Sequence, residues 1–207
     1  MKLFELHEQD EFDLEKFKKD CAPFLAELKG ASSVLYHGSN HGVDDYQIRT
    51  FRERTRPRDT PRDVHAALND VFKERYGHEI RNWMFTTGSR HDARVYGPLQ
   101  VIFPIGQNYH YVWSPFVYDM TTHRVSFVDK HQGLPYDECQ EKANDEFLND
   151  IATTTFHVDK QLHAAVNSAH EIHLKCETFY AFNWIGDTYE RIVQPFLNKE
   201  ILNHETD

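Results

Sequence analysis

The sequence predicts an α+β fold, in a single domain that spans residues 1–207. Segments with the apolar spacing of a helix are 13–29, 60–77, 136–150, 158–166 and 187–200. Short runs rich in β-branched and aromatic residues are 34–40, 81–87, 101–104, 109–119 and 171–182. The chain has 207 residues, of which 40% are hydrophobic, so it can bury one sizeable core and is too apolar for a disordered protein.

Charge and composition exclude several broad classes of function. The formal net charge is −10, which argues against a general coat for nucleic acid and against binding to an anionic membrane surface. No apolar run is long enough for a transmembrane helix, and the first residues carry acids where a signal peptide needs an apolar run. We therefore expect a cytoplasmic protein. Three widely spaced cysteines without a CxxC pair suggest reduced thiols.

The N-terminal part of the chain is expected to pack and then to present a histidine. Residues 1–30 are predicted to be a helical packing segment, in which Pro23 splits or kinks the helix. Residues 34–40, Val-Leu-Tyr-His-Gly-Ser-Asn, predict a short strand that ends in a turn. His37 then faces a cleft, and Gly38 lets the backbone approach a ligand closely. The alternative is an ordinary strand and turn.

An arginine-rich segment follows and is the sharpest charge anomaly in this acidic chain. We expect residues 41–60 to form a loop without regular structure; its arginines are Arg49, Arg52, Arg54, Arg56 and Arg58. Guanidinium groups suit phosphate, so one interpretation is an anion-binding loop beside a cleft. The other is a solvated loop whose arginines pair with nearby acids.

The middle of the chain predicts a strand that leads into a short helix with a tyrosine at its end. Residues 81–87 have strand composition, Ser89 suits the N-cap of a helix with Asp92 at its third position, and Tyr96 falls in the last turn. Residues 101–104 and 109–119 suggest a hairpin, and 120–135 a loop or ribbon. Glu171 starts an alternating strand whose apolar face is Ile172, Leu174 and Cys176.

Most familiar catalytic motifs are absent. The sequence contains no HExxH, and His170 and His173 would point to opposite sides of a strand, so we expect no metal site. It also contains no GxGxxG, no phosphate-binding Walker loop and no GxSxG, which leaves Rossmann, P-loop and α/β-hydrolase functions without support.

Three short motifs resemble those of ADP-ribosyltransferases of the diphtheria-toxin and poly(ADP-ribose)-polymerase type. They are VLYHGS, MFTTGSRHDARVYG and HEIHLKCETFYAF, and they occur in the family's order of His, Tyr and Glu. The chain also resembles small phage-encoded proteins of this fold, through the run RPRDTP and the stretch VIFPIG…YVWSP. The resemblance implies a split β-sheet core with flanking helices, NAD as the substrate, and a phage-encoded enzyme that modifies a host or defence component.

The resemblance also implies roles for individual residues. Glu171 would stabilise the oxocarbenium-like ribose formed when NAD is cleaved, a charge that a carboxylate can offset. His37 would bind the adenosine-side ribose, Gly38 the nicotinamide amide, and Tyr96 would stack on the nicotinamide ring. The remaining candidates for binding NAD are Tyr36, Ser39, Thr86, Arg54, Arg56 and Arg58, with the arginines at the pyrophosphate.

Several alternatives stay open at this stage. Tyr96 could be a core tyrosine and Glu171 a surface acid, and Glu177 is a second candidate for the third motif. Members that modify arginine carry an acid two residues before the catalytic glutamate, where this chain has Ala169, so the resemblance implies another acceptor. The rival function is an inactive protein of the same fold that binds NAD, ADP-ribose or a partner protein and inhibits host defence.

Overall fold

The computed structural model describes residues 11–53 and 60–202, and they form a mixed α+β structure around one antiparallel sheet. The strands are β1 Tyr36–Gly38, β2 Tyr46–Thr50, β3 Met84–Thr87, β4 Leu99–Pro104, β5 Tyr109–Trp113, β6 His157–Val158, β7 Glu171–Cys176 and β8 Thr178–Asn183. The helices are α1 Leu14–Asp20, α2 Ala22–Leu28, α3 Arg62–Tyr76, α4 Arg90–Val95, α5 Met120–Lys130, α6 Tyr136–Thr153, α7 Leu162–Ser168 and α8 Gln194–Glu200, with the short turns η1 Ile80–Asn82 and η2 Tyr189–Val193.

The sheet has the strand order β2-β8-β4-β1-β3-β7-β5-β6, and it narrows in the middle. Strands β1 and β3 are joined by a single residue pair, Tyr36 with Thr87. On either side of this seam the strands pair over longer stretches, such as five pairs between β4 and β8 and four between β3 and β7. The sheet therefore consists of two halves that meet at a narrow seam.

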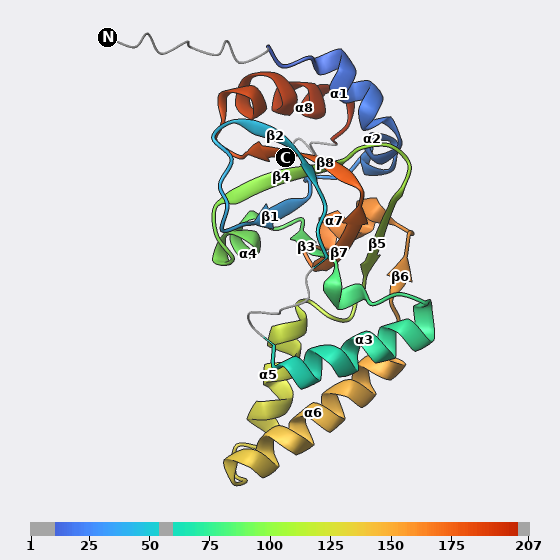
Figure 1. Cartoon of the computed structure of the whole chain (residues 1–207), viewed down its shortest axis with the longest axis vertical. Helices are drawn as coiled ribbons and strands as arrows, with labels where there is room; N and C mark the ends of the chain where they lie inside the picture. The colour runs from blue at the N-terminus through green and yellow to red at the C-terminus, as the bar shows by residue number, and fades with distance from the viewer. Residues whose placement is uncertain (1–10, 54–59, 203–207) are drawn as a thin grey trace, which may run out of the picture.

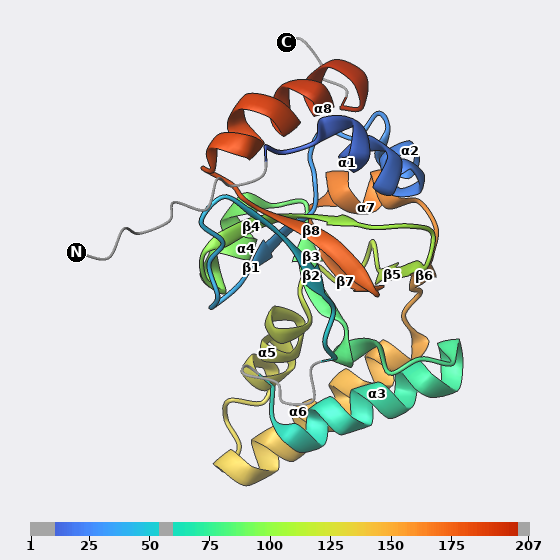
Figure 2. The ribbon, with the colours of Figure 1, turned by 45° about the horizontal axis from the view of Figure 1, so that its top comes forward.

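One layer of helices covers one face of the sheet and holds the larger core. Figure 1 and Figure 2 show α1, α2 and α8 on this side, with α7 beside α2. Phe17 of α1 is fully buried, and its ring meets the rings of Phe103 and Phe182 edge-on at 5.1 and 5.6 Å between centroids. Such edge-to-face contacts between buried rings add to the free energy gained by burying their area. This aromatic core fixes α1 against β4 and β8.

The helices α3, α5 and α6 form an arm on the other side of the sheet (Figure 1). Its core is a second cluster in which Phe72 of α3 and Phe147 of α6 are 0% and 1% exposed. Trp83 and Val112 belong to the same cluster, so the arm packs on the β3 and β5 part of the sheet. The cluster thus anchors the arm beside the seam.

Several predicted elements are confirmed. The helix over 13–29 is split before Pro23 into α1 and α2, and Ser89 caps α4 by accepting a hydrogen bond from the Asp92 N–H. In β7 the side chains alternate as expected, since Ile172 and Leu174 lie in the larger core. All three cysteines are buried and free.

Three predictions of local structure are wrong. We expected a loop over residues 41–60, of which 41–53 and 60 are described, but Tyr46–Thr50 pairs with β8 as an edge strand. Most of its side chains are exposed, which hides the strand pattern. Strands β4 and β5 are not a hairpin: β4 pairs with β1 and β8, whereas β5 pairs with β6 and β7. Residues 120–130 form α5 rather than a ribbon, because the Asp119 side chain caps the helix and α6 supplies its packing.

Candidate functional site

A cavity of about 550 Å³ opens on the sheet, and it is the site that the sequence motifs converge on. Its volume lies within the usual range for pockets that bind small molecules, about 300–1,000 Å³. The residues that line it are His37, Gly38, Ser39, Asn40, His41, Arg49, Thr50, Phe51, Arg52, Met84, Tyr96, Gln100 and Phe179. The first motif supplies three of these residues and the second supplies Met84 and Tyr96, so the two motifs meet here.

Strand register aims the polar side chains at the cavity. His37 lies opposite Gln100 on β4, and Arg49 lies opposite Phe179 on β8, so each pair shares a face of the sheet. Tyr36, one residue before His37, points to the other face and packs edge-on against Trp184 at 5.5 Å. Met84 comes from the far side of the seam. The cavity therefore takes side chains from both halves of the sheet.

The His37 ring is oriented by a backbone contact. Its Nδ1 donates a hydrogen bond to the Phe85 carbonyl at 2.7 Å. In the neutral ring this fixes the proton on Nδ1 and leaves the acceptor lone pair on Nε2. The ring is thereby presented in one tautomer, as a residue that recognises a ligand hydroxyl requires.

Gly38 is required for the close approach of helix α4. A Cβ atom at this position would lie 1.9 Å from the Ala93 carbonyl oxygen and 2.9 Å from Cβ of Tyr96. No side chain fits there without moving the α4 backbone. The glycine therefore acts mainly by letting α4 bring Tyr96 to the cavity.

Tyr96 follows directly on α4 and connects the cavity to the third motif. Its ring lies 4.8 Å from the ring of Phe85, and its hydroxyl is 3.4 Å from Oδ2 of Asp119, to which it donates. Met120, which follows Asp119 in the chain, donates its backbone N–H to Oε2 of Glu171 at 2.6 Å. Tyr96, Asp119 and Glu171 are thus linked in series, and the sequence motifs gave no signal for Asp119.

Glu171 is buried and held on both carboxylate oxygens. Oε1 accepts from Nη1 of Arg81 at 2.6 Å and lies 3.0 Å from Nε2 of His173. Burial raises the pKa of this carboxyl, but the charges of Arg81 and His173 and the hydrogen bonds outweigh it and lower the pKa to about 2. Glu171 is therefore ionised at neutral pH, although it does not line the cavity.

The pKa of Asp119 shifts in the opposite direction. Burial and the neighbouring negative charge of Glu171 raise its pKa, while its Oδ1 accepts the Thr122 N–H at 2.7 Å as the N-cap of α5. Asp119, which contacts Tyr96, and Glu171, which bonds the residue after Asp119, therefore have opposite pKa shifts.

The other predicted site residues divide into three groups. Ser39 lines the cavity, together with His37, Gly38 and Tyr96. Tyr36 and Thr86 do not: Tyr36 is in the core, and Thr86 is fully buried with its hydroxyl donated to the Ile172 carbonyl. Glu177 is exposed and does not line it either. The arginines Arg54, Arg56 and Arg58 lie outside the described residues.

The structure adds residues that the motifs did not select. Arg49 and Arg52 belong to the arginine-rich segment and line the cavity, with Gln100 and Phe179 beside them. The clustering of arginines was the available signal for the first two. Gln100 lies outside the three motifs. Phe179 lies within the third motif, but no local feature marks it as a site residue, and only the pairing of β2, β8 and β4 brings both side chains here.

Comparison with known proteins gives no relative: no family model, no curated protein and no solved structure matches the chain. Within residues 11–53 and 60–202, no group of three or more His, Cys, Asp or Glu side chains could hold a metal ion. None of the helices in these ranges is long and apolar enough to cross a membrane.

Proposed function

We propose that the protein is an NAD-dependent ADP-ribosyltransferase. The observation that carries the proposal is the cavity at the seam, where His37 and Gly38 of the first motif meet Tyr96 of the second. The third motif lies one step behind, through the contact of Tyr96 with Asp119 and the bond from Met120 to Glu171. Three motifs that are far apart in the sequence are thus neighbours in space, which supports the proposal.

The residue types suit that reaction. Loss of nicotinamide leaves positive charge on the ribose, and an ionised carboxylate stabilises such a transition state. Glu171, with its pKa near 2, supplies a permanent negative charge. His37 would accept a hydrogen bond from the other ribose, Gly38 would leave room for the nicotinamide amide, and Tyr96 would stack on the ring. Glu171 is covered in the structure, and Tyr118 and Met120 both form backbone hydrogen bonds with it. We therefore expect the segment that carries Tyr118 and Met120 to move so that the carboxylate can reach the ribose.

The rival function, an inactive protein that binds NAD or ADP-ribose, has one specific observation in its favour. Both oxygens of Glu171 already have partners, and its side chain is 6% exposed. A carboxylate held in this way is a structural group unless the covering segment opens. The cavity residues would still bind a ligand in that case, without cleaving it.

Adenine-labelled NAD separates the two functions. The full chain and its Glu171→Gln variant are incubated with host lysate, and both label transfer and free nicotinamide are measured. If the protein is the enzyme, we expect label transfer or nicotinamide release that is about 100-fold or more slower in Glu171→Gln. Glu177→Gln tests the second candidate for the third motif. Because Glu177 is exposed and does not line the cavity, we expect this variant to keep its activity, and a loss in Glu177→Gln alone would make Glu177 the residue of the third motif. If the wild-type chain gives neither product while calorimetry still detects bound NAD, the transferase proposal fails and the binding function stands.

The acceptor is left to that experiment. With Ala169 at the position where an arginine-modifying enzyme carries an acid, we expect transfer to another side chain, to nucleic acid or to a small molecule. A phage origin and an action on a host or defence component follow from the resemblance alone and belong to this proposal.

A further inference from the structure

The cavity is cationic in a chain that is strongly acidic. Its lining includes Arg49, Arg52, His37 and His41, and among residues 11–53 and 60–202 no aspartate or glutamate lines it. The whole chain has 33 acidic and 23 basic residues, so this lining differs in sign from the net charge of the chain. A concave surface of one sign concentrates ligands of the opposite sign.

Arg49 has the more hydrogen bonds of the two lining arginines, and they fix its position. Its Nε donates to Oε1 of Gln47 at 3.1 Å, and its two terminal nitrogens donate to the His41 carbonyl at 3.3 Å each. One of them also donates to the Gly42 carbonyl at 3.1 Å, and the other to Oε1 of Gln100 at 3.3 Å. Gln100 itself donates to the His41 carbonyl at 2.7 Å, which ties the cluster together.

Every one of these partners is a neutral oxygen. Among the described residues, none of the ion pairs involves Arg49, whereas Arg81 pairs with Glu171 and Arg191 with Asp187. Partial burial lowers the pKa of the Arg49 guanidinium, which shows that removing it from water is unfavourable for the charge. Neutral acceptors orient the group but leave its charge uncompensated, which is how a binding site for an anion is built.

The surrounding side chains narrow the class of anion. Phe51, Phe179 and Tyr96 give the same cavity aromatic surface, on which a flat ring can stack. A small inorganic anion would leave most of about 550 Å³ empty. A ligand that joins a ring system to phosphate groups uses both features, and its phosphates would replace the weak bonds from Arg49 to backbone carbonyls with charge-assisted ones.

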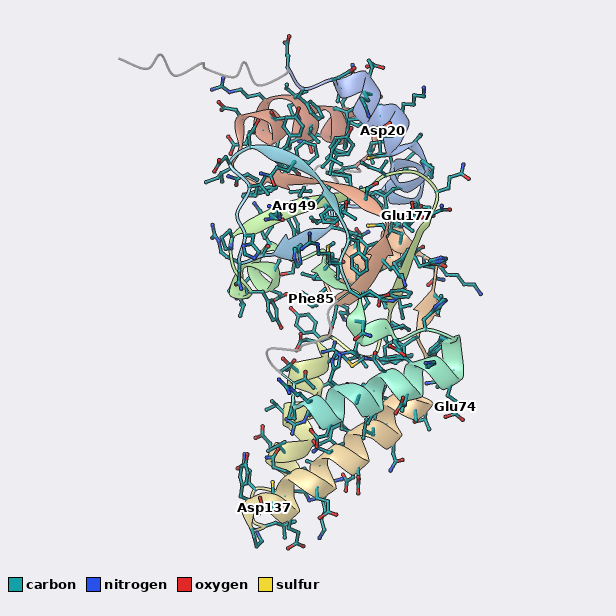
Figure 3. The ribbon with its side chains drawn as sticks, viewed as in Figure 1. Asp20, Arg49, Glu74, Phe85, Asp137 and Glu177 are labelled. Atoms are coloured by element: carbon teal, nitrogen blue, oxygen red, sulfur yellow. The ribbon has the colours of Figure 1, made fainter. Side chains whose placement is uncertain are left out.

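We propose that Arg49 is the anchor of a diphosphate subsite in this cavity, which takes nucleotides of the ADP-ribose class. The sequence suggested Arg54, Arg56 and Arg58 as the residues that bind the diphosphate. We propose this role for Arg49, which lies on β2 and is labelled in Figure 3. The identity of the nucleotide rests on the proposed function, but binding and cleavage can fail separately.

Calorimetry with three probes tests the subsite on the full chain. The probes are ADP-ribose, adenosine and inorganic pyrophosphate, and the variants are Arg49→Gln, Arg49→Lys and the control Arg191→Gln, whose side chain is 77% exposed. We expect the wild type to bind ADP-ribose at least about 10-fold more tightly than adenosine, and Arg49→Gln to weaken ADP-ribose about 10- to 100-fold while adenosine is unchanged. Arg49→Lys should fall between, and Arg191→Gln should match the wild type.

Salt and pyrophosphate supply readouts that a structural role would not change. Raising the salt concentration should weaken ADP-ribose binding by the wild type more than by Arg49→Gln, because one charge contact has been removed. Pyrophosphate should compete with ADP-ribose; failure to compete would mean that the phosphates lie elsewhere and would overturn the subsite. If Arg49→Gln does not fold, the comparison of ADP-ribose with adenosine on wild type and Arg49→Lys decides.

Two further outcomes contradict the proposal directly. The first is equal affinity of ADP-ribose for wild type and Arg49→Gln, and the second is no binding of ADP-ribose to the wild type. Arg49-dependent binding without any release of nicotinamide from NAD would instead uphold the subsite and refute the transferase.

Discussion

Replacing Arg81 by leucine should destabilise the protein strongly at neutral pH. Arg81 and Glu171 form an ion pair at 2.6 Å with side chains only 8% and 6% exposed. Leucine would leave Glu171 ionised and buried with His173 and the Met120 N–H as its remaining partners. Removing one partner of a buried pair usually costs about 3–5 kcal/mol.

The pKa of Glu171 gives the net effect of its burial and of all its partners together, of which Arg81 is one. It lies at about 2 in the folded protein against 4.5 for the free side chain. A difference of about 2.5 units corresponds to about 3 kcal/mol of stability, at 1.36 kcal/mol per unit. Because the folded-state pKa is the lower one, this stability is present in full above pH 4.5 and is lost as the pH falls from 4.5 to about 2.

Urea unfolding at pH 7 and at pH 3 provides the assay. Without Arg81 the pKa of Glu171 rises, so the variant gains from protonation where the wild type loses. The free-energy difference between wild type and Arg81→Leu should therefore shrink as the pH falls. The control Arg191→Leu breaks an exposed pair and should change stability by no more than about 0.5 kcal/mol. A loss below about 1 kcal/mol at pH 7, or a difference that does not change with pH, would refute the reasoning.

Three other outcomes are expected. Gly38→Ala should lower the free energy of unfolding by about 1–3 kcal/mol in chemical denaturation and abolish ADP-ribose binding, because the new Cβ would clash with the Ala93 carbonyl. In the control Gly42→Ala the new Cβ has no atom within 4 Å, so both stability and binding should be unchanged. Cys176, whose pKa burial raises to about 12, should resist alkylation at pH 8 in the native protein and react in urea, as should the equally buried Cys21; fast native labelling of either would contradict their burial. Dialysis against a chelator should leave the melting temperature and any NAD cleavage unchanged, and a fall in either would show a metal site that we do not expect.

Sequence reasoning succeeded where a pattern is local. The helix break before Pro23, the Ser89 cap of α4 and the alternation of β7 each depend on a few adjacent residues, and each is found in the structure. The α+β class follows from counting such segments. The glycine after His37 is also a local feature, but its contact with Ala93 and Tyr96 of the α4 region is visible only in the structure.

It failed where pairing over long distances decides. Residues 101–104 and 109–113 have the composition of a hairpin, yet β4 joins one half of the sheet and β5 the other. In helix α5 only Met120 is buried, so its sequence has no apolar stripe that predicts a helix. The Asp119 cap and the contacts of Arg124 with α6 stabilise the helix although its sequence is rich in β-branched residues, which disfavour helices. Arg81 and Asp119 were missed for the same reason, since they belong to the site only through contacts with residues far away in the sequence, Glu171 and Tyr96.

The narrow seam between β1 and β3 explains why core and cavity are coupled in this protein. Tyr36 and His37 are adjacent on β1, so the register that buries the first against Trp184 also directs the second to the cavity. The strand has three residues and only one pair to β3, so its pairing with β3 contributes little to that register. It is held by its pairing with β4, by the Tyr36 ring in the core and by α4 pressed onto Gly38. The cavity geometry is therefore a product of core packing, and the orientation of His37 depends on Tyr36 and Ala93, which do not line the cavity.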